Sequence, residues 1–104
     1  MDVQLKRGML EALVLSAISR GESYGYKIIS DVAPYIDMSE STLYPILKRL
    51  EKTGMVTVRT AEHNGRLRKY YKITGDGRLR IREFLADMDE FLKVHAFIKG
   101  GANE

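Results

Sequence analysis

The residues best suited to chemistry lie between Ser39 and Gly54, and they suit contact with a nucleic acid better than catalysis. Leucine and isoleucine at helical spacing predict that one side of this stretch faces a core. The other side begins with residues that can meet base edges in the major groove, namely Ser39, Glu40, Ser41, Thr42, Tyr44 and Pro45. A glutamate accepts a hydrogen bond from cytosine N4, a hydroxyl reads either kind of base, and a ring packs on the thymine methyl. One turn further on, Lys48 and Arg49 would reach phosphates or a guanine.

Three of these residues have a second interpretation that the sequence leaves open. Tyr44 can equally belong to the core, and Arg49 can form an ion pair on the surface. Pro45 can serve only to shape the start of the helix. Its missing amide is harmless there if Ser41 is the N-cap, but it kinks the helix if Ser39 is the N-cap.

A second group of cations, Arg66, Arg68 and Lys69, follows the Asn64-Gly65 dipeptide. We expect these side chains to hold phosphates or to enter the adjoining minor groove, which gives affinity more than sequence choice.

The charge of the chain is unevenly distributed. From Lys48 to Arg82 there are eleven Lys or Arg against three acids, a local balance of +8, whereas the whole chain carries +3. Clustered positive charge repels itself unless a partner neutralises it, so the pattern favours a polyanion such as double-stranded DNA. The alternative is a basic face that is merely solvated.

Signs of catalysis, cofactors and membrane insertion are lacking in the sequence. There are no cysteines, and the two histidines, His63 and His95, lack the spacing of metal ligands. Gly75-Asp76-Gly77 is too short for a phosphate-binding loop, and no serine has a plausible base. No apolar run could span a bilayer. We therefore expect a soluble, cytoplasmic protein that is not an enzyme and needs no cofactor.

The elements that position the first group should be three helices. Apolar periodicity predicts a helix from about Gln4 to Ser19 and a second from Ser23, as its cap, to about Ala33. Pro34 ends the second helix, and the short linker returns the helix from Ser39 against the first two. Two helices joined by a brief turn, with a polar face on the second, are typical of a helix-turn-helix.

A hairpin should position the second group. After Gly54 the apolar period becomes two, which predicts strands from about Val56 to Ala61 and from Arg68 to Thr74. Asn64-Gly65 is the turn signal, in a loop that its charged neighbours suggest is longer than two residues. A hairpin after the third helix makes a winged helix-turn-helix.

A long helix should close the chain, capped by Thr74 and apolar along one face for over five turns. The face comprises Ile81, Phe84, Leu85, Met88, Phe91, Leu92, His95 and Ile98. Three short helices and a hairpin cannot cover so long a stripe, which predicts a homodimer packed through this helix. The alternative is a helix that folds back wholly on its own domain. The expected fold is therefore mostly α with a β-hairpin: a winged helix-turn-helix domain over 1–75, a dimerisation helix over 76–99 and a disordered tail over 100–104.

A series of short motifs runs along the chain: Arg7-Gly8 with Leu10, Tyr24-Gly25-Tyr26, Ser41-Thr42-Leu43-Tyr44-Pro45 with Leu47, Arg49-Leu50-Glu51 and Gly54, Arg68-Lys69-Tyr70-Tyr71 with Ile73-Thr74, and Gly77. In this order and spacing the chain resembles the PadR-type transcriptional regulators along almost its whole length. Ser41 stands where the family motif often has glycine. The resemblance implies a bacterial repressor of the short subfamily, in which one C-terminal helix makes the dimer that binds an inverted-repeat operator.

The resemblance also implies a partner of another kind. Some relatives respond to phenolic acids or to planar hydrophobic drugs held between the subunits, so a small hydrophobic or phenolic effector is expected by analogy. The equivalent region here offers Met9, Phe84, Met88 and Phe91 and no tryptophan. Two alternatives stay open: a winged helix used only to bind proteins, and a dimer whose main task is to sense a ligand.

Overall fold

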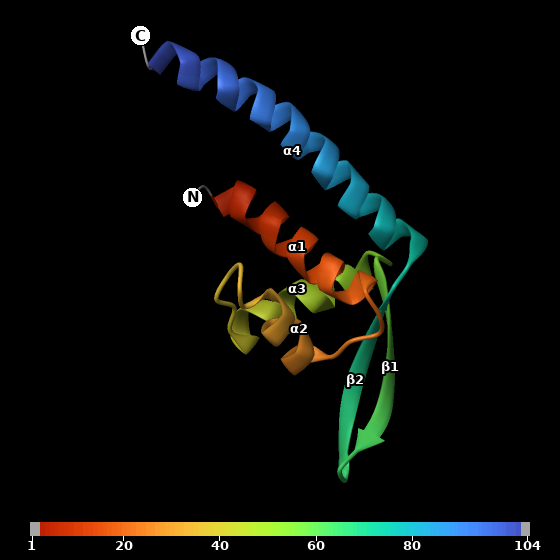
Figure 1. The fold of residues 1–104 in the computed structure, drawn as a ribbon. Coiled ribbons are helices and arrows are strands. Elements are labelled where there is room, and N and C mark those ends of the chain that lie inside the picture. The colour runs from red at the N-terminus through yellow and green to blue at the C-terminus, as the bar shows by residue number, and fades with distance from the viewer. Residues whose placement is uncertain (1–2, 103–104) are drawn as a thin grey trace.

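The computed structural model describes residues 3–102, and within them the chain is mostly helical with one antiparallel hairpin (Figure 1). The elements, in chain order, are α1 (Val3–Ser19), α2 (Gly25–Val32), α3 (Glu40–Lys52), β1 (Val56–His63), β2 (Arg66–Ile73) and α4 (Gly75–Ala102). The first three helices pack together, α4 lies along α1, and the hairpin projects away from the helices. This arrangement confirms the fold class that the sequence predicts. No helix among residues 3–102 combines the length and the apolar character that a membrane crossing demands.

The core lies where the inner faces of α1, α2 and α3 meet the base of the hairpin. Its buried side chains are Val14, Leu15, Ala17, Ile18, Ile28, Val32, Met38, Leu43, Ile46, Leu47, Leu50, Val56 and Tyr71. These are the residues of the apolar stripes, since a helix in a small domain buries one face and leaves the other in water. Each fully buried leucine contributes roughly 1.5–3 kcal/mol by leaving water, so the stripes fix how the three helices pack.

The connection between α1 and α2 differs from the prediction at Ser23. This residue does not cap α2: the N-cap is Tyr24, which makes no side-chain capping bond. Ser23 instead pairs with Tyr71 of β2, donating its N–H to the Tyr71 carbonyl at 3.0 Å and accepting from the Tyr71 N–H at 2.8 Å. The two backbone bonds hold the residue as a third, one-residue strand. A tertiary contact therefore overrides the local capping preference of serine.

Helix α3 begins after Ser39, which decides between the two predicted caps. The Ser39 hydroxyl accepts a hydrogen bond from the Thr42 N–H at 3.3 Å. At the other end Gly54 adopts a positive φ of 75°, as expected of a glycine that stops a helix. Pro45 consequently lies inside the helix and leaves the Ser41 carbonyl without its usual donor four residues on.

The hairpin is longer and its turn tighter than the sequence predicts. His63 pairs with Arg66, so only Asn64 and Gly65 form the turn. Both have positive φ, 51° and 79°. A two-residue turn of this kind matches the twist of the strands, and Asn-Gly is its preferred dipeptide. The strands thus run to His63 and from Arg66, and the predicted longer loop was wrong.

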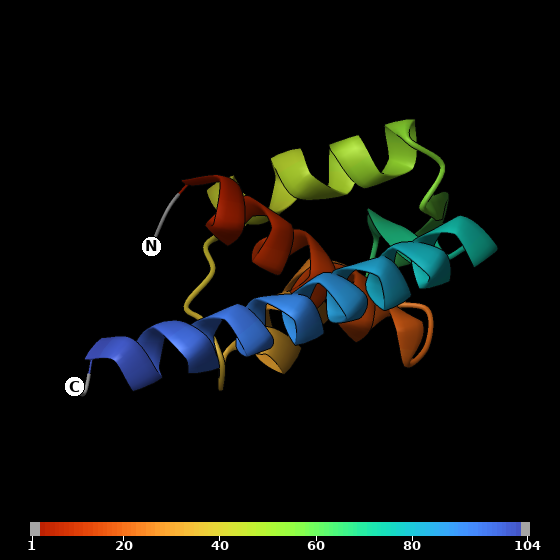
Figure 2. The same cartoon turned by 90° about the horizontal axis from the view of Figure 1, so that it is seen from above.

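Helix α4 begins at Gly75 under the predicted cap, because the Gly77 N–H donates to the Thr74 hydroxyl at 3.2 Å. Its first half packs on α1, and its C-terminal end extends past the rest of the domain in both views (Figure 2). The helix continues through Ala102, so the predicted disorder from Gly100 was wrong for residues 100–102. The last two residues of that predicted tail lie outside the described part of the chain.

Candidate nucleic-acid interface

The predicted reading residues form one exposed face of α3 and its cap. Ser39, Glu40, Ser41, Thr42, Tyr44, Pro45 and Lys48 are all exposed. Three hydroxyls gather at the start of the helix, where Ser39 shares hydrogen bonds with Ser41 at 2.9 Å and with Thr42 at 3.2 Å. Lys52, which the sequence analysis did not single out as a contact, continues this face by one turn. The face thus presents neutral hydroxyls and a carboxylate first and cations later.

Arg49 does not belong to this face. It lies at the flank of α3, half-buried, and its guanidinium donates from Nε and Nη2 to the Glu11 Oε2 atom of α1 at 3.3 Å and 3.0 Å. Arg80 of α4 approaches the other oxygen of Glu11 at 3.9 Å. The partner of Arg49 is therefore a carboxylate on another helix, and this ion pair ties α3 to α1.

Replacing Glu11 with glutamine should lower the free energy of unfolding by about 1–2 kcal/mol, because the half-buried Arg49 loses its charged acceptor. The Glu11 side chain is only 13% exposed, so water replaces the carboxylate poorly. Urea denaturation followed by circular dichroism measures the change. Arg80→Gln is the control, since that contact is long and largely solvated and should shift stability by less than about 0.5 kcal/mol. Equal midpoints for wild type and Glu11→Gln would show that the pair adds nothing.

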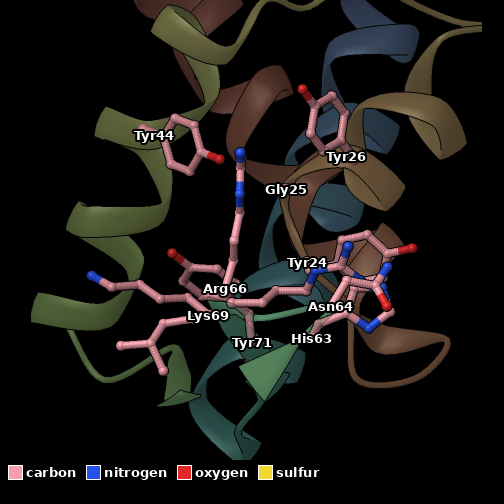
Figure 3. Close-up of a pocket in the computed structure, with 11 residues that line it drawn as sticks. Tyr24, Gly25, Tyr26, Tyr44, His63, Asn64, Arg66, Lys69 and Tyr71 are labelled. Atoms are coloured by element: carbon pink, nitrogen blue, oxygen red, sulfur yellow. The ribbon is translucent and has the colours of Figure 1, made fainter. Parts of the chain in front are cut away.

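A groove of about 480 Å³ separates the start of α2, the face of α3 and the edge of β2 (Figure 3). Its lining is aromatic and basic: Tyr24, Gly25, Tyr26, Tyr44, His63, Asn64, Arg66, Leu67, Arg68, Lys69 and Tyr71. In Figure 3 the Arg66 side chain extends across the groove toward Tyr44 and Gly25, and the Lys69 side chain extends toward α3. Burial raises the pKa of the Tyr71 phenol at the floor, so it stays neutral. A groove with this lining suits an extended anion.

Tyr44 lines the groove and lies against Gly25. This position answers the question, left open by the sequence, of whether Tyr44 belongs to the core. It is 48% exposed, so it is not a core residue. Its hydroxyl lies so close to Gly25 that a Cβ atom there would stand 2.8 Å from it. A side chain at position 25 would therefore displace the outer end of the Tyr44 ring from the head of the groove.

Of the three predicted hairpin cations, Arg66 and Lys69 are exposed and Arg68 is not free. The Arg68 guanidinium carbon lies 4.0 Å from the centre of the Tyr24 ring. The neighbouring Arg59 lies over the Tyr70 ring at 4.6 Å. Its guanidinium donates to the Glu22 carboxylate at 2.8 Å and 2.6 Å, and these bonds hold the pKa of Glu22 below its usual value.

Sequence reasoning missed several exposed apolar side chains at the two ends of the molecule. Leu67, 80% exposed, lies on the hairpin between two arginines, and Tyr26 is 72% exposed at the rim of the groove. On α4, Val94 and Phe97 are exposed beside the predicted stripe, Phe97 by 84%. A helix that is apolar around more than one face was the available signal for the last two.

The predicted dimer stripe has a half-buried part and an exposed part. Ile81, Phe84 and Met88 are half-buried. Leu85, Phe91, Leu92, His95 and Ile98 are exposed. The alternative, a helix that folds back on its own domain, thus holds for the first half of α4 only, and the apolar face of the second half lacks cover among residues 3–102. Those same residues hold no cluster of three side chains that could bind a metal ion.

The three packed helices, the hairpin and its basic edge define a winged helix-turn-helix with one long helix appended. The family model described as the transcriptional regulator PadR-like family matches residues 14–83, and the chain belongs to that family. Membership confirms the resemblance drawn from the motifs. It also places the chain among regulators rather than enzymes, as the sequence predicts.

Individual relatives agree with this family. An uncharacterised protein of Lysinibacillus sphaericus is 30% identical over 93 residues, which is 85% of each chain. The crystal structure of a PadR family transcriptional regulator from Eggerthella lenta matches with a TM-score of 0.82 at 32% identity, over 92% of this chain and 86% of that one. The negative transcriptional regulator PadR of Bacillus subtilis is 29% identical over 82 residues, which is 74% of this chain but 45% of that protein. A crystal structure of B. subtilis PadR in complex with operator DNA matches with a TM-score of 0.68 over the same shares.

Proposed function

We propose that the chain is a transcriptional repressor that binds an inverted-repeat operator as a homodimer. Helix α3 enters the major groove with Ser41, Thr42, Tyr44 and Pro45 toward the bases, and the hairpin lies on the backbone or in the minor groove. The observation that carries this proposal is the exposed polar face of α3 beside the basic edge of β2, with a groove between them. A helix of this diameter fits the major groove of B-DNA.

The relatives support the proposal at the level of the class of partner. The B. subtilis protein carries the name of a negative regulator and has been crystallised with its operator. The match to it includes 74% of this chain, although the chain spans less than half of that protein. Repression by this chain, acting on the chromosome in the cytoplasm, is inferred from that name and from the site.

The homodimer follows from the apolar second half of α4. Four predicted stripe residues, Phe91, Leu92, His95 and Ile98, are exposed there, with Val94 and Phe97 beside them. A second copy of the same helix would cover them in a symmetric, self-complementary contact. Two copies related by a two-fold axis would set two α3 helices about one DNA turn apart, which is the geometry that reads an inverted repeat.

The decisive experiment is binding to the chain's own promoter region, measured by fluorescence anisotropy with a fragment of unrelated sequence as competitor. We expect nanomolar affinity for a fragment that contains a palindrome and affinity at least about a thousandfold weaker for unrelated DNA. Equal affinity for both fragments would overturn the proposal. The absence of binding to any duplex, even at low salt, would favour a winged helix that binds proteins instead.

Replacing Arg66 or Lys69 with glutamine should flatten the dependence of operator affinity on salt. Each phosphate contact adds about one unit to the slope of log affinity against log salt, so each variant should lose about one unit. Affinity for operator and for unrelated DNA should fall by similar factors, because these residues hold the backbone. Thr57→Val, at an exposed position on β1 remote from the groove, should keep the wild-type slope.

A further inference from the structure

Five side chains connect the hairpin to the turn between α1 and α2, and we call them the clasp: Glu22, Tyr24, Arg59, Arg68 and Tyr70. The Tyr24 and Tyr70 rings meet edge to face, with centroids 5.8 Å apart and planes at 72°. The Arg68 guanidinium lies 4.0 Å over Tyr24 and 6.0 Å from Tyr70. Arg59 lies over the Tyr70 ring at 4.6 Å and is held by both oxygens of Glu22. The clasp therefore joins two rings and two cations and ends on a carboxylate.

The clasp lies at a point along the hairpin where it can limit the bending and twisting of the outer part of the two strands. Backbone bonds between Ser23 and Tyr71 fix the base of β2. Beyond Tyr71 the two strands continue for five more residue pairs to the turn. Over this length only a two-stranded ribbon remains, and such a ribbon is marginal and twists easily by itself. Among the ring contacts and ion pairs of residues 3–102, those of the clasp lie farthest out along the hairpin.

Strand alternation places Arg66 and Arg68 on one face of the hairpin and Lys69 on the other. Arg68 lies on the same face as Tyr70 and opposite Ala61, whereas Lys69 lies on the other face with Tyr71. Arg68 is also half-buried, whereas Lys69 and Arg66 are exposed. A planar guanidinium packs flat on a ring, and an ammonium cannot reproduce that contact. The Arg68 side chain thus makes a stacking contact within the protein, whereas Arg66 and Lys69 are exposed.

We infer that Arg68 is a positioning residue that sets the angle of the hairpin to α3 through Tyr24, and that it is not itself a main phosphate contact. The inference rests on the proposed function, since the angle matters only if α3 and the hairpin bind one duplex together. Arg66 and Lys69 then supply the backbone contacts, and the clasp places them at the right distance from α3.

Arg68→Lys tests this role because it keeps the charge and removes the flat contact. A positioning role predicts a loss of operator affinity of about three- to tenfold, the size of a cation–π contact, with the salt slope of the wild type. A phosphate contact predicts near wild-type affinity instead. The matched control is Lys69→Arg, which should bind as the wild type does. Faster amide exchange in β1 and β2 of Arg68→Lys, with unchanged rates in α1, would locate the effect in the hairpin and exclude general destabilisation.

A double-mutant cycle with Tyr24→Leu provides the second test. Leucine keeps the apolar bulk and removes the ring face. If Arg68 acts through Tyr24, the double variant should bind about as well as either single variant, whereas independent roles give losses that multiply. Multiplying losses, or Arg68→Lys within twofold of the wild type, would overturn the positioning role and leave the proposed function intact. A wild-type chain that does not prefer its own promoter would overturn both.

Discussion

Replacing Leu92 with glutamate is expected to convert the dimer to monomers and to lower operator affinity by at least about a hundredfold. Leu92 is 55% exposed in the protomer, so the substitution should leave the fold intact. In the proposed dimer it would place a carboxylate in an apolar contact, which costs several kcal/mol per subunit. Operator affinity falls because linking two half-site contacts raises binding by about 10²–10⁴ over one alone.

The measurement combines light scattering after size exclusion with anisotropy on operator fragments carrying one or two half-sites. Leu92→Glu should bind both fragments alike, whereas the wild type should prefer the fragment with two. Lys93→Gln is the matched control, since it changes the net charge by the same unit at the next position, on the polar side of α4. A dimer that survives Leu92→Glu would show that the subunits meet elsewhere.

Much of the fold could be predicted because its signals are local. The caps at Ser39 and Thr74 and the turn at Asn64-Gly65 each depend on residues within about four positions. The length of the hairpin could not be predicted in the same way. Residues next to the turn are exposed on both faces, so neither Arg66 nor His63 shows the alternation that marks a half-buried strand.

The roles of the arginines depend on partners far along the chain, and sequence patterns do not carry that information. Arg49 pairs with Glu11, 38 positions away, and Arg59 with Glu22, 37 positions away. The sequence pattern around a basic residue on a predicted DNA-contacting helix or hairpin is the same whether its side chain faces solvent or packs on another element. Arg49 is paired because α1 packs against α3, and Arg59 is paired because the turn between α1 and α2 packs against the hairpin. These tertiary contacts decide which cations are paired within the protein and which are left for a partner.

Replacing Gly77 with alanine should destabilise the protein by about 2–3 kcal/mol, the usual cost of forcing a methyl group into a filled space. Gly77 is buried where the first turn of α4 crosses the start of β1. A Cβ atom there would press on the Met55 carbonyl oxygen and stand 2.7 Å from the Ile73 side chain. The Met55 carbonyl also accepts a hydrogen bond from the Thr74 N–H at 3.1 Å, and backbone yields less than a flexible side chain.

Thermal unfolding measures this effect, and a loss of that size should lower the melting temperature by roughly 10–20 °C in a domain of about 100 residues. Gly75→Ala is the matched control in the same turn, because a Cβ atom at Gly75 meets nothing within 4 Å. Alanine there should be neutral or stabilise α4 by up to about 1 kcal/mol. A Gly77→Ala variant that melts with the wild type would mean that α4 can start farther from the hairpin. Gly77→Ala molecules that stay folded should also bind the operator less well, because in the proposed dimer α4 would set the spacing of the two α3 helices and its first turn would have to tilt.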